Sequence, residues 1–169
     1  MKQGFWHRLD LLARSLTPTM ITLLLVMAGM IPLHIAGLTS MVPFMALIAV
    51  YYWVVHKPDL MPLWVIFMIG LFHDLLHGGY VGVGILALLL VQVIVDTQRR
   101  YFARASFHGL WVMFAVVGGV AIYFMWLLNC ILQGAILESG PALFQFLTTV
   151  AVYPLLAWIF AKVQKAVLV

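Results

Sequence analysis

Six mostly apolar stretches follow one another along this sequence of 169 residues, and they constrain the fold more than any other feature. They cover residues 17–33, 41–55, 60–76, 80–95, 108–132 and 141–161. A helix needs about 20 mostly apolar residues to cross the hydrocarbon core of a membrane. A soluble fold of this size could not bury a chain that is 66% hydrophobic and 8% charged, because small domains leave much of their surface exposed. The sequence therefore predicts an all-α, polytopic membrane protein with six transmembrane helices in one integral membrane domain, residues 1–169.

The basic residues predict how these six spans are oriented. If all six stretches cross the membrane, the nine Lys and Arg residues fall on one side, and the three loops on the other side contain none. These residues are Lys2, Arg8, Arg14, Lys57, Arg99, Arg100, Arg104, Lys162 and Lys165. Because cytoplasmic loops are enriched in Lys and Arg, both termini are predicted to lie in the cytoplasm.

Residues 1–16 precede the first apolar stretch and are predicted to form an interfacial amphipathic helix. Phe5, Leu9, Leu12 and Leu16 recur at helical spacing and give the segment one apolar face. A helix of this kind lies in the plane of the lipid headgroups. A cleavable signal peptide is the alternative interpretation, since a basic start precedes an apolar run.

Asp74 is the one carboxylate well within an apolar stretch, where an aspartate costs about 3 kcal/mol at a helix centre. Three interpretations stay open. His73 and His77, four residues apart on one helix face, could form a metal or proton site with Asp74. Asp74 could instead cap the neighbouring turn or bind another helix, which we favour, or the turn could belong to a partner surface. Gly78 and Gly82 follow with the small-xxx-small spacing that lets helices approach closely.

The remaining residues exclude several classes of function. No serine, cysteine or aspartate is arranged as a nucleophile with a base, and no glycine-rich phosphate loop is present, so neither an enzyme nor a cofactor is predicted. The basic residues are too dispersed for a nucleic-acid interface. Arg99, Arg100 and Arg104 lie between the fourth and fifth stretches, where they are predicted to contact anionic lipid or a cytoplasmic protein partner.

Several short motifs occur in an order that resembles a known family. They are LLARSL at residues 11–16, YYW at 51–53, KPDLMP at 57–62, GLFHDLLHG at 70–78, QRRYF at 98–102 and YP at 153–154. In this order and spacing the sequence resembles the bacterial rod shape-determining MreD family, in particular its alphaproteobacterial branch. Tyr80 stands where many members carry a proline, and His77 stands where a small residue is commoner.

This resemblance implies a non-catalytic scaffold of the bacterial inner membrane, within the machinery of cell elongation and peptidoglycan synthesis. The partners that it implies are the single-span protein MreC, the glycosyltransferase RodA, a class B penicillin-binding protein and the actin-like MreB, with a homodimer left open. The helical arrangement is also similar to that of the S components of energy-coupling-factor transporters. That similarity gives the alternative function, a small-molecule-binding membrane subunit. The candidates for a structural or partner-binding role are Asp74, Gly78, Gly82, Arg99, Arg100 and Arg104.

Overall fold

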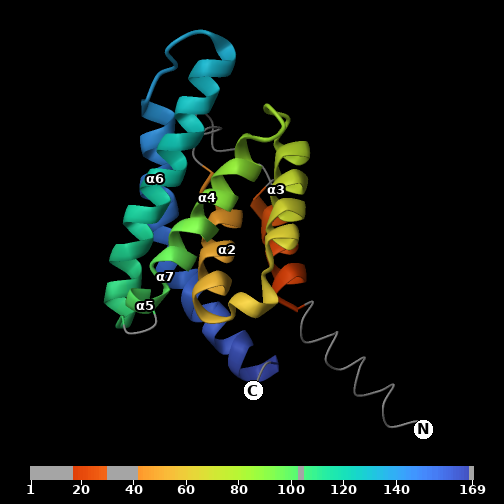
Figure 1. The fold of residues 1–169 in the computed structure, drawn as a ribbon, viewed down its shortest axis with the longest axis vertical. Helices are drawn as coiled ribbons and strands as arrows, with labels where there is room; N and C mark the ends of the chain where they lie inside the picture. The colour runs from red at the N-terminus through yellow and green to blue at the C-terminus, as the bar shows by residue number, and fades with distance from the viewer. Residues whose placement is uncertain (1–16, 30–41, 103–104, 168–169) are drawn as a thin grey trace, which may run out of the picture.

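The computed structural model describes residues 17–29, 42–102 and 105–167 of the chain. This part is helical without any strand (Figure 1), which confirms the all-α prediction. The helices are Thr17–Gly29, α2 (Met45–His56), α3 (Leu63–His77), α4 (Val83–Thr97), α5 (Arg99–Phe102), α6 (Phe107–Gln133) and α7 (Gly140–Val167), with the 3₁₀-helix η1 (Pro58–Leu60) between α2 and α3. Each apolar stretch predicted from the sequence coincides with one of the longer helices. The predicted interfacial helix at residues 1–16 lies outside the described residues.

The helices differ markedly in length. Among the described helices, α6 and α7 are long and apolar enough to cross a membrane. With 27 residues at 1.5 Å per residue, α6 is about 40 Å long. With 12 residues in α2 and 15 in each of α3 and α4, these helices are about 18 Å and 22 Å long, less than a hydrocarbon core of about 30 Å. The number of membrane spans therefore stays a prediction.

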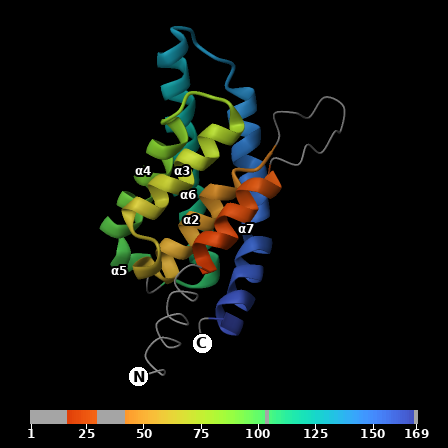
Figure 2. The same ribbon diagram turned by 90° about the vertical axis from the view of Figure 1, so that its right-hand side faces the viewer.

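α2 is the central helix of the bundle. Its side chains from Ala46 to Val54 are all buried, and the helix packs against α3, α4 and α7 (Figures 1 and 2). A helix that meets neighbours on every side needs apolar residues all round, which explains why α2 has no polar face. Tyr51 ties it to α6, since its hydroxyl donates to the carbonyl of Leu110 at 3.0 Å and its ring packs edge-on against Phe114.

α7 contains a proline, Pro154, within its length. Because proline has no N–H, the carbonyl of Val150, four residues earlier, loses its helical hydrogen bond. The indole N–H of Trp111 in α6 donates to this carbonyl at 3.1 Å. A side chain of the neighbouring helix thus satisfies the group that the proline leaves unpaired, and it joins α6 to α7.

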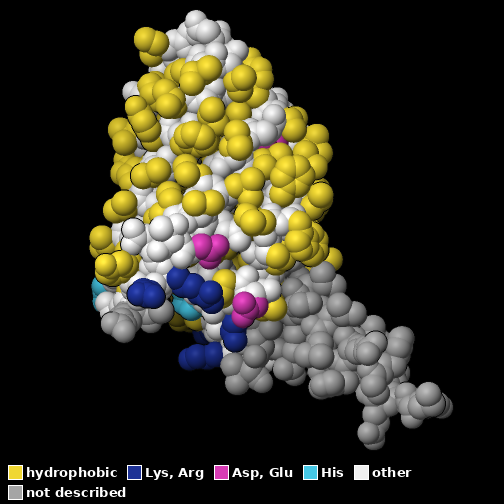
Figure 3. All heavy atoms as spheres, viewed as in Figure 1, with side chains coloured by type: hydrophobic (Ala, Val, Ile, Leu, Met, Phe, Trp, Pro, Cys, Tyr) yellow, Lys and Arg dark blue, Asp and Glu magenta, His cyan; other side chains and the backbone are white. Residues whose placement is uncertain are grey.

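Charged side chains gather at one end of the bundle, which we call the charged end (Figure 3). This end is formed by η1 and the residue before it, the last turn of α4, α5 and the last turns of α7 (Figure 1). These segments carry Lys57, Asp59, Asp96, Arg99, Arg100, Lys162 and Lys165. Apolar side chains cover most of the surface between this end and the α6–α7 loop in the same view. Two acidic residues lie apart from the charged end, Asp74 in the last turn of α3 and Glu138 in the α6–α7 loop.

Candidate functional site: the Asp74 junction

The side chain of Asp74, which is 6% exposed, joins the last turn of α3 to the first turn of α4. Its Oδ2 accepts a hydrogen bond from the backbone N–H of Gly82 at 2.8 Å, and both carboxylate oxygens lie 3.1 Å from the backbone nitrogen of Gly84. The N–H of Ile85 donates to Oδ2 at 3.4 Å. These donors begin α4, where a helix has no carbonyl of its own to pair with them. Asp74 therefore caps α4 from the preceding helix, and its negative charge lies at the positive end of the helix dipole.

The local sequence explains why a carboxylate from another helix caps α4. Gly82 occupies the N-cap position with a φ of 112°, a left-handed conformation that favours glycine. N-cap residues usually supply a side-chain oxygen, which glycine lacks. Asp74, eight residues earlier, supplies it instead. Gly78 ends α3 with a φ of 66°, so both glycines shape the turn between the two helices.

Two other glycines allow α3 and α4 to pack closely. A Cβ atom at Gly70 would lie 2.7 Å from the Cα of Ile85, and one at Gly84 would collide with the carboxylate that caps α4. A Cβ atom at Gly78 or Gly82 would meet no heavy atom of the described residues within 4 Å. Among the described residues, the small-xxx-small spacing of Gly78 and Gly82 therefore makes no helix contact, because the chain turns between them and they do not share a helix face.

Two histidines extend the contacts of this carboxylate. His73 and His77 stack with their ring centroids 4.1 Å apart, and Nδ1 of His73 lies 3.3 Å from Oδ1 of Asp74. The ring of Phe44, just before α2, packs against that of His73 at 4.7 Å. The hydroxyl of Thr149 in α7 accepts the N–H of Phe44 at 2.9 Å. We call this set the Asp74 junction, and it consists of Phe44, His73, Asp74, His77, Gly82, Gly84, Ile85 and Thr149.

The chemistry of the junction is that of a hydrogen-bonded helix connection. Within the described residues, no group of three or more His, Cys, Asp or Glu side chains could hold a metal ion. A tetrahedral zinc site needs four ligands. One ring nitrogen of His77, Nδ1, lies 3.0 Å from the backbone carbonyl of His73, so this nitrogen is engaged within α3. The carboxylate of Asp74 accepts its hydrogen bonds from backbone N–H groups. The arrangement can therefore fix the positions of α2, α3, α4 and α7 relative to one another.

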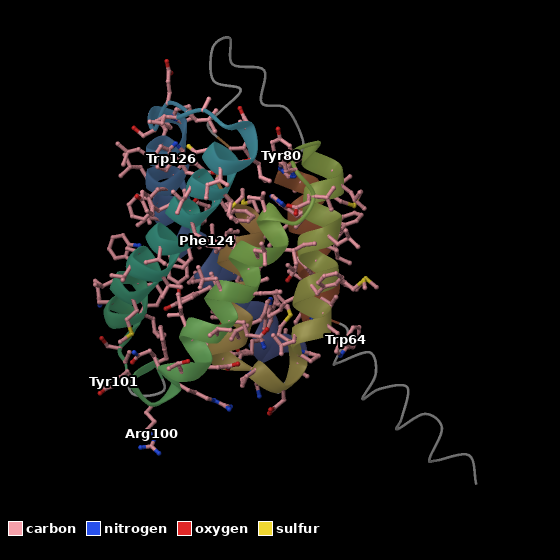
Figure 4. All side chains as sticks on the ribbon, turned by 45° about the horizontal axis from the view of Figure 1, so that its top comes forward. Trp64, Tyr80, Arg100, Tyr101, Phe124 and Trp126 are labelled. Carbon is pink, nitrogen blue, oxygen red and sulfur yellow. The ribbon has the colours of Figure 1, made fainter. Side chains whose placement is uncertain are left out.

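The basic candidates lie at the other end of α4. Arg99 and Arg100 belong to α5, and Figure 4 shows Arg100 and Tyr101 at the end of the bundle opposite to Tyr80. An open groove of about 420 Å³ lies here, and the side chains that line it are all exposed. They are those of Asp96, Thr97, Arg99, Arg100 and Tyr101. Arg104 lies outside the described residues. The structure does not bring the arginines of α5 near the Asp74 junction.

A second groove, of about 330 Å³, lies between α6 and α7 near Trp126, away from the charged end (Figure 4). Its lining combines apolar side chains with four polar ones, Asn129, Gln133, Glu138 and Gln145. These residues could not be grouped from their spacing in the sequence, because two helices and the loop between them contribute to the groove.

Long apolar helices, charges gathered at one end and a buried carboxylate that caps a helix are typical of a helical membrane protein. The chain belongs to the MreD family, because the family model described as rod shape-determining protein MreD matches residues 10–166. This membership implies a role in rod shape determination. No curated protein and no solved structure is significantly similar to the chain. The similarity to transporter S components stays a prediction.

Proposed function

We propose that the chain is a non-catalytic scaffold of the cell-elongation complex in the bacterial inner membrane. It crosses the membrane six times, with both termini and the charged end in the cytoplasm. The gathering of Lys57, Arg99, Arg100 and the C-terminal lysines at one end of an otherwise apolar bundle supports this orientation. On the cytoplasmic side, the α5 arginines contact anionic lipid or a cytoplasmic partner such as MreB.

The observation that carries a scaffold role is the match of nearly the whole chain to a shape-determining family. The use of Asp74 supports it, because the buried carboxylate is engaged by backbone N–H groups of α4. A side chain committed to holding helices together suits a rigid platform for other proteins. The exposed turn beside it, with Tyr80 47% and Val81 59% exposed, offers a surface on the outer side.

The partners follow from this location. An MreC-like single-span protein binds the outer end of the α3–α4 hairpin, and RodA and a class B penicillin-binding protein are held in the same complex. A second copy of the chain is a further candidate partner. These assignments rest on the family and on the position of the turn.

Co-purification from native membranes tests the proposal. A tagged copy of the chain, extracted in mild detergent, should retain the MreC-like protein and the elongation glycosyltransferase. Depletion of the chain should convert rod-shaped cells to spheres. Recovery of a pair of ATPase subunits with a bound small molecule, and no elongation protein, would contradict the scaffold role and favour a transporter subunit.

A further inference from the structure

The two halves of the bundle differ in the length of membrane that they could cross. α4 ends and α6 begins at the charged end, where α5 lies between them in the chain. The distance that each helix reaches from the charged end can therefore be compared directly. α4 has 15 residues and is about 22 Å long, whereas α6 has 27 residues and is about 40 Å long. Figure 1 accordingly shows the turn between α3 and α4 ending well short of the loop between α6 and α7. A bilayer has a hydrocarbon core of about 30 Å, which α6 can cross at full thickness, whereas α3 and α4 are too short to cross it unless the core is thinner beside them.

The turn between α3 and α4 has exposed backbone that lipid tails cannot satisfy. Three glycines lie there, Gly78, Gly79 and Gly82, and a Cβ atom at any of them would meet no heavy atom of the described residues within 4 Å. Tyr80 and Val81 between them are exposed. Irregular backbone in contact with hydrocarbon is not tolerated, because its N–H and C=O groups find no partners there. Water or lipid headgroups must therefore reach this turn.

The outward faces of the two halves fit lipid of different thickness. On α3 the large exposed apolar side chains are Leu63, Trp64, Phe67, Met68 and Leu75. Trp64 at the charged end and Tyr80 at the turn (Figure 4) flank this face with aromatic rings, which favour the membrane interface. On α6 the large exposed apolar side chains are Phe107, Trp111, Val112, Val116, Val120, Tyr123, Leu127, Ile131 and Leu132. From Phe107 to Leu132 these side chains cover about 38 Å of helix, enough for a full hydrocarbon core, whereas those of α3, from Leu63 to Leu75, cover about 18 Å.

We propose that the lipid bilayer is locally thinner against α3 and α4 than against α6 and α7. The occupant of the α3–α4 face is lipid, whose outer headgroups descend to the turn at Gly78–Gly82. A hydrophobic stretch shorter than the bilayer is accommodated in this way by thinning. The thinning brings water and headgroups to the Asp74 junction, so that the junction lies at a membrane surface, where the outer segment of a single-span partner can reach it. This inference rests on the proposed membrane orientation.

Spin labels at matched heights test the inference. Single cysteines replace Tyr80 in the turn, Tyr123 on α6 and Ser139 in the α6–α7 loop, each in a Cys130→Ser background, which keeps an acceptor for the N–H of Leu137. Tyr123 is the matched control because it is exposed and lies at a similar height. Its distance from the charged end, measured along α6, is about the same as the distance from the charged end to the α3–α4 turn, measured along α4. Each labelled protein is reconstituted into short-chain and long-chain phosphatidylcholine. Collision rates with a water-soluble nickel complex and with oxygen then report the depth of the label.

In long-chain bilayers, the labels at Tyr80 and Ser139 should collide several-fold more with the nickel complex than the label at Tyr123. Shortening the lipid chains should reduce this difference, because Tyr123 then approaches the headgroups while Tyr80 is already there. Equal depth for Tyr80 and Tyr123 in long-chain lipid would overturn the inference, and so would a Tyr80 label shielded from both reagents, since protein would then cover the turn. A further variant with a single cysteine at Gln98 is reconstituted in the same way. The side of the vesicle membrane on which the cysteines at positions 98 and 139 lie shows whether the proposed orientation is right, independently of whether the bilayer is thinner beside α3 and α4.

Discussion

Replacing Asp74 by leucine should destabilise the protein by roughly 3 kcal/mol or more. The change removes the acceptor of three backbone N–H groups at the start of α4, those of Gly82, Gly84 and Ile85. A buried donor left without a partner costs about 1–3 kcal/mol. The N–H groups of Gly84 and Ile85 are buried and that of Gly82 is half-buried, so the three together give a loss of this size. The loss should appear as a lower midpoint of thermal unfolding of the detergent-solubilised protein, and as weaker retention of the MreC-like partner.

Two controls make this prediction specific. Asp74→Asn keeps one acceptor oxygen and should lose markedly less stability than Asp74→Leu. Asp96→Leu removes an exposed carboxylate at the charged end and should leave the unfolding midpoint nearly unchanged. If Asp74→Leu and Asp96→Leu unfold at the same temperature, Asp74 does not hold α3 and α4 together. If Asp74→Asn is as damaging as Asp74→Leu, the negative charge itself is needed and the site has an ionic role.

Replacing Gly70 by leucine should separate α3 from α4 and cost about 3 kcal/mol, the upper part of the usual range for overpacking a core. Even the first carbon of the new side chain would lie 2.7 Å from the Cα of Ile85, and a backbone atom cannot rotate away. Because the Asp74 junction needs the two helices in register, partner retention should fall together with the unfolding midpoint.

Gly79→Leu is the matched control for this substitution. Gly79 lies in the turn, where a Cβ atom would meet no described heavy atom within 4 Å. The same added volume should therefore change the unfolding midpoint little. Similar losses for Gly70→Leu and Gly79→Leu would show that the close approach of α3 to α4 at Gly70 is not what stabilises the hairpin.

The sequence predicted the helices well, because an uninterrupted apolar run leaves few alternatives to a helix. The short second stretch, residues 41–55, was visible in the sequence, but its burial on every side as α2 was not. Its residues, Ala46 to Val54, are as apolar as those of a lipid-facing helix, and composition does not distinguish burial in protein from burial in lipid. Only the packing of the neighbouring helices distinguishes the two environments.

The candidate site was predicted in part. Asp74 stood out as a carboxylate in an apolar stretch, and capping was the interpretation that we favoured. The two glycines of the close helix contact, Gly70 and Gly84, lie 14 positions apart on different helices, and their spacing gives no signal. The bond from Phe44 to Thr149 joins residues that are 105 positions apart, so sequence alone could not reveal it.

One pairing had a partial signal in the sequence. Pro154 within a long apolar helix predicts that the carbonyl of Val150 needs a new donor. The sequence does not say which side chain supplies it, and several indole groups were available. The choice of Trp111 depends on how α6 lies against α7, which is a property of the folded bundle.

The bundle, as we propose, crosses the membrane with its charged end in the cytoplasm. Single cysteines at Gln98 and Ala166, on the charged end, and at Ser139, in the α6–α7 loop, test it directly in a Cys130→Ser background. In spheroplasts, a membrane-impermeant maleimide should label the cysteine at position 139 at once. It should label those at 98 and 166 only after the membrane is permeabilised. Labelling at position 98 or 166 in intact spheroplasts would contradict the orientation, and with it the proposed place of the protein in the elongation complex.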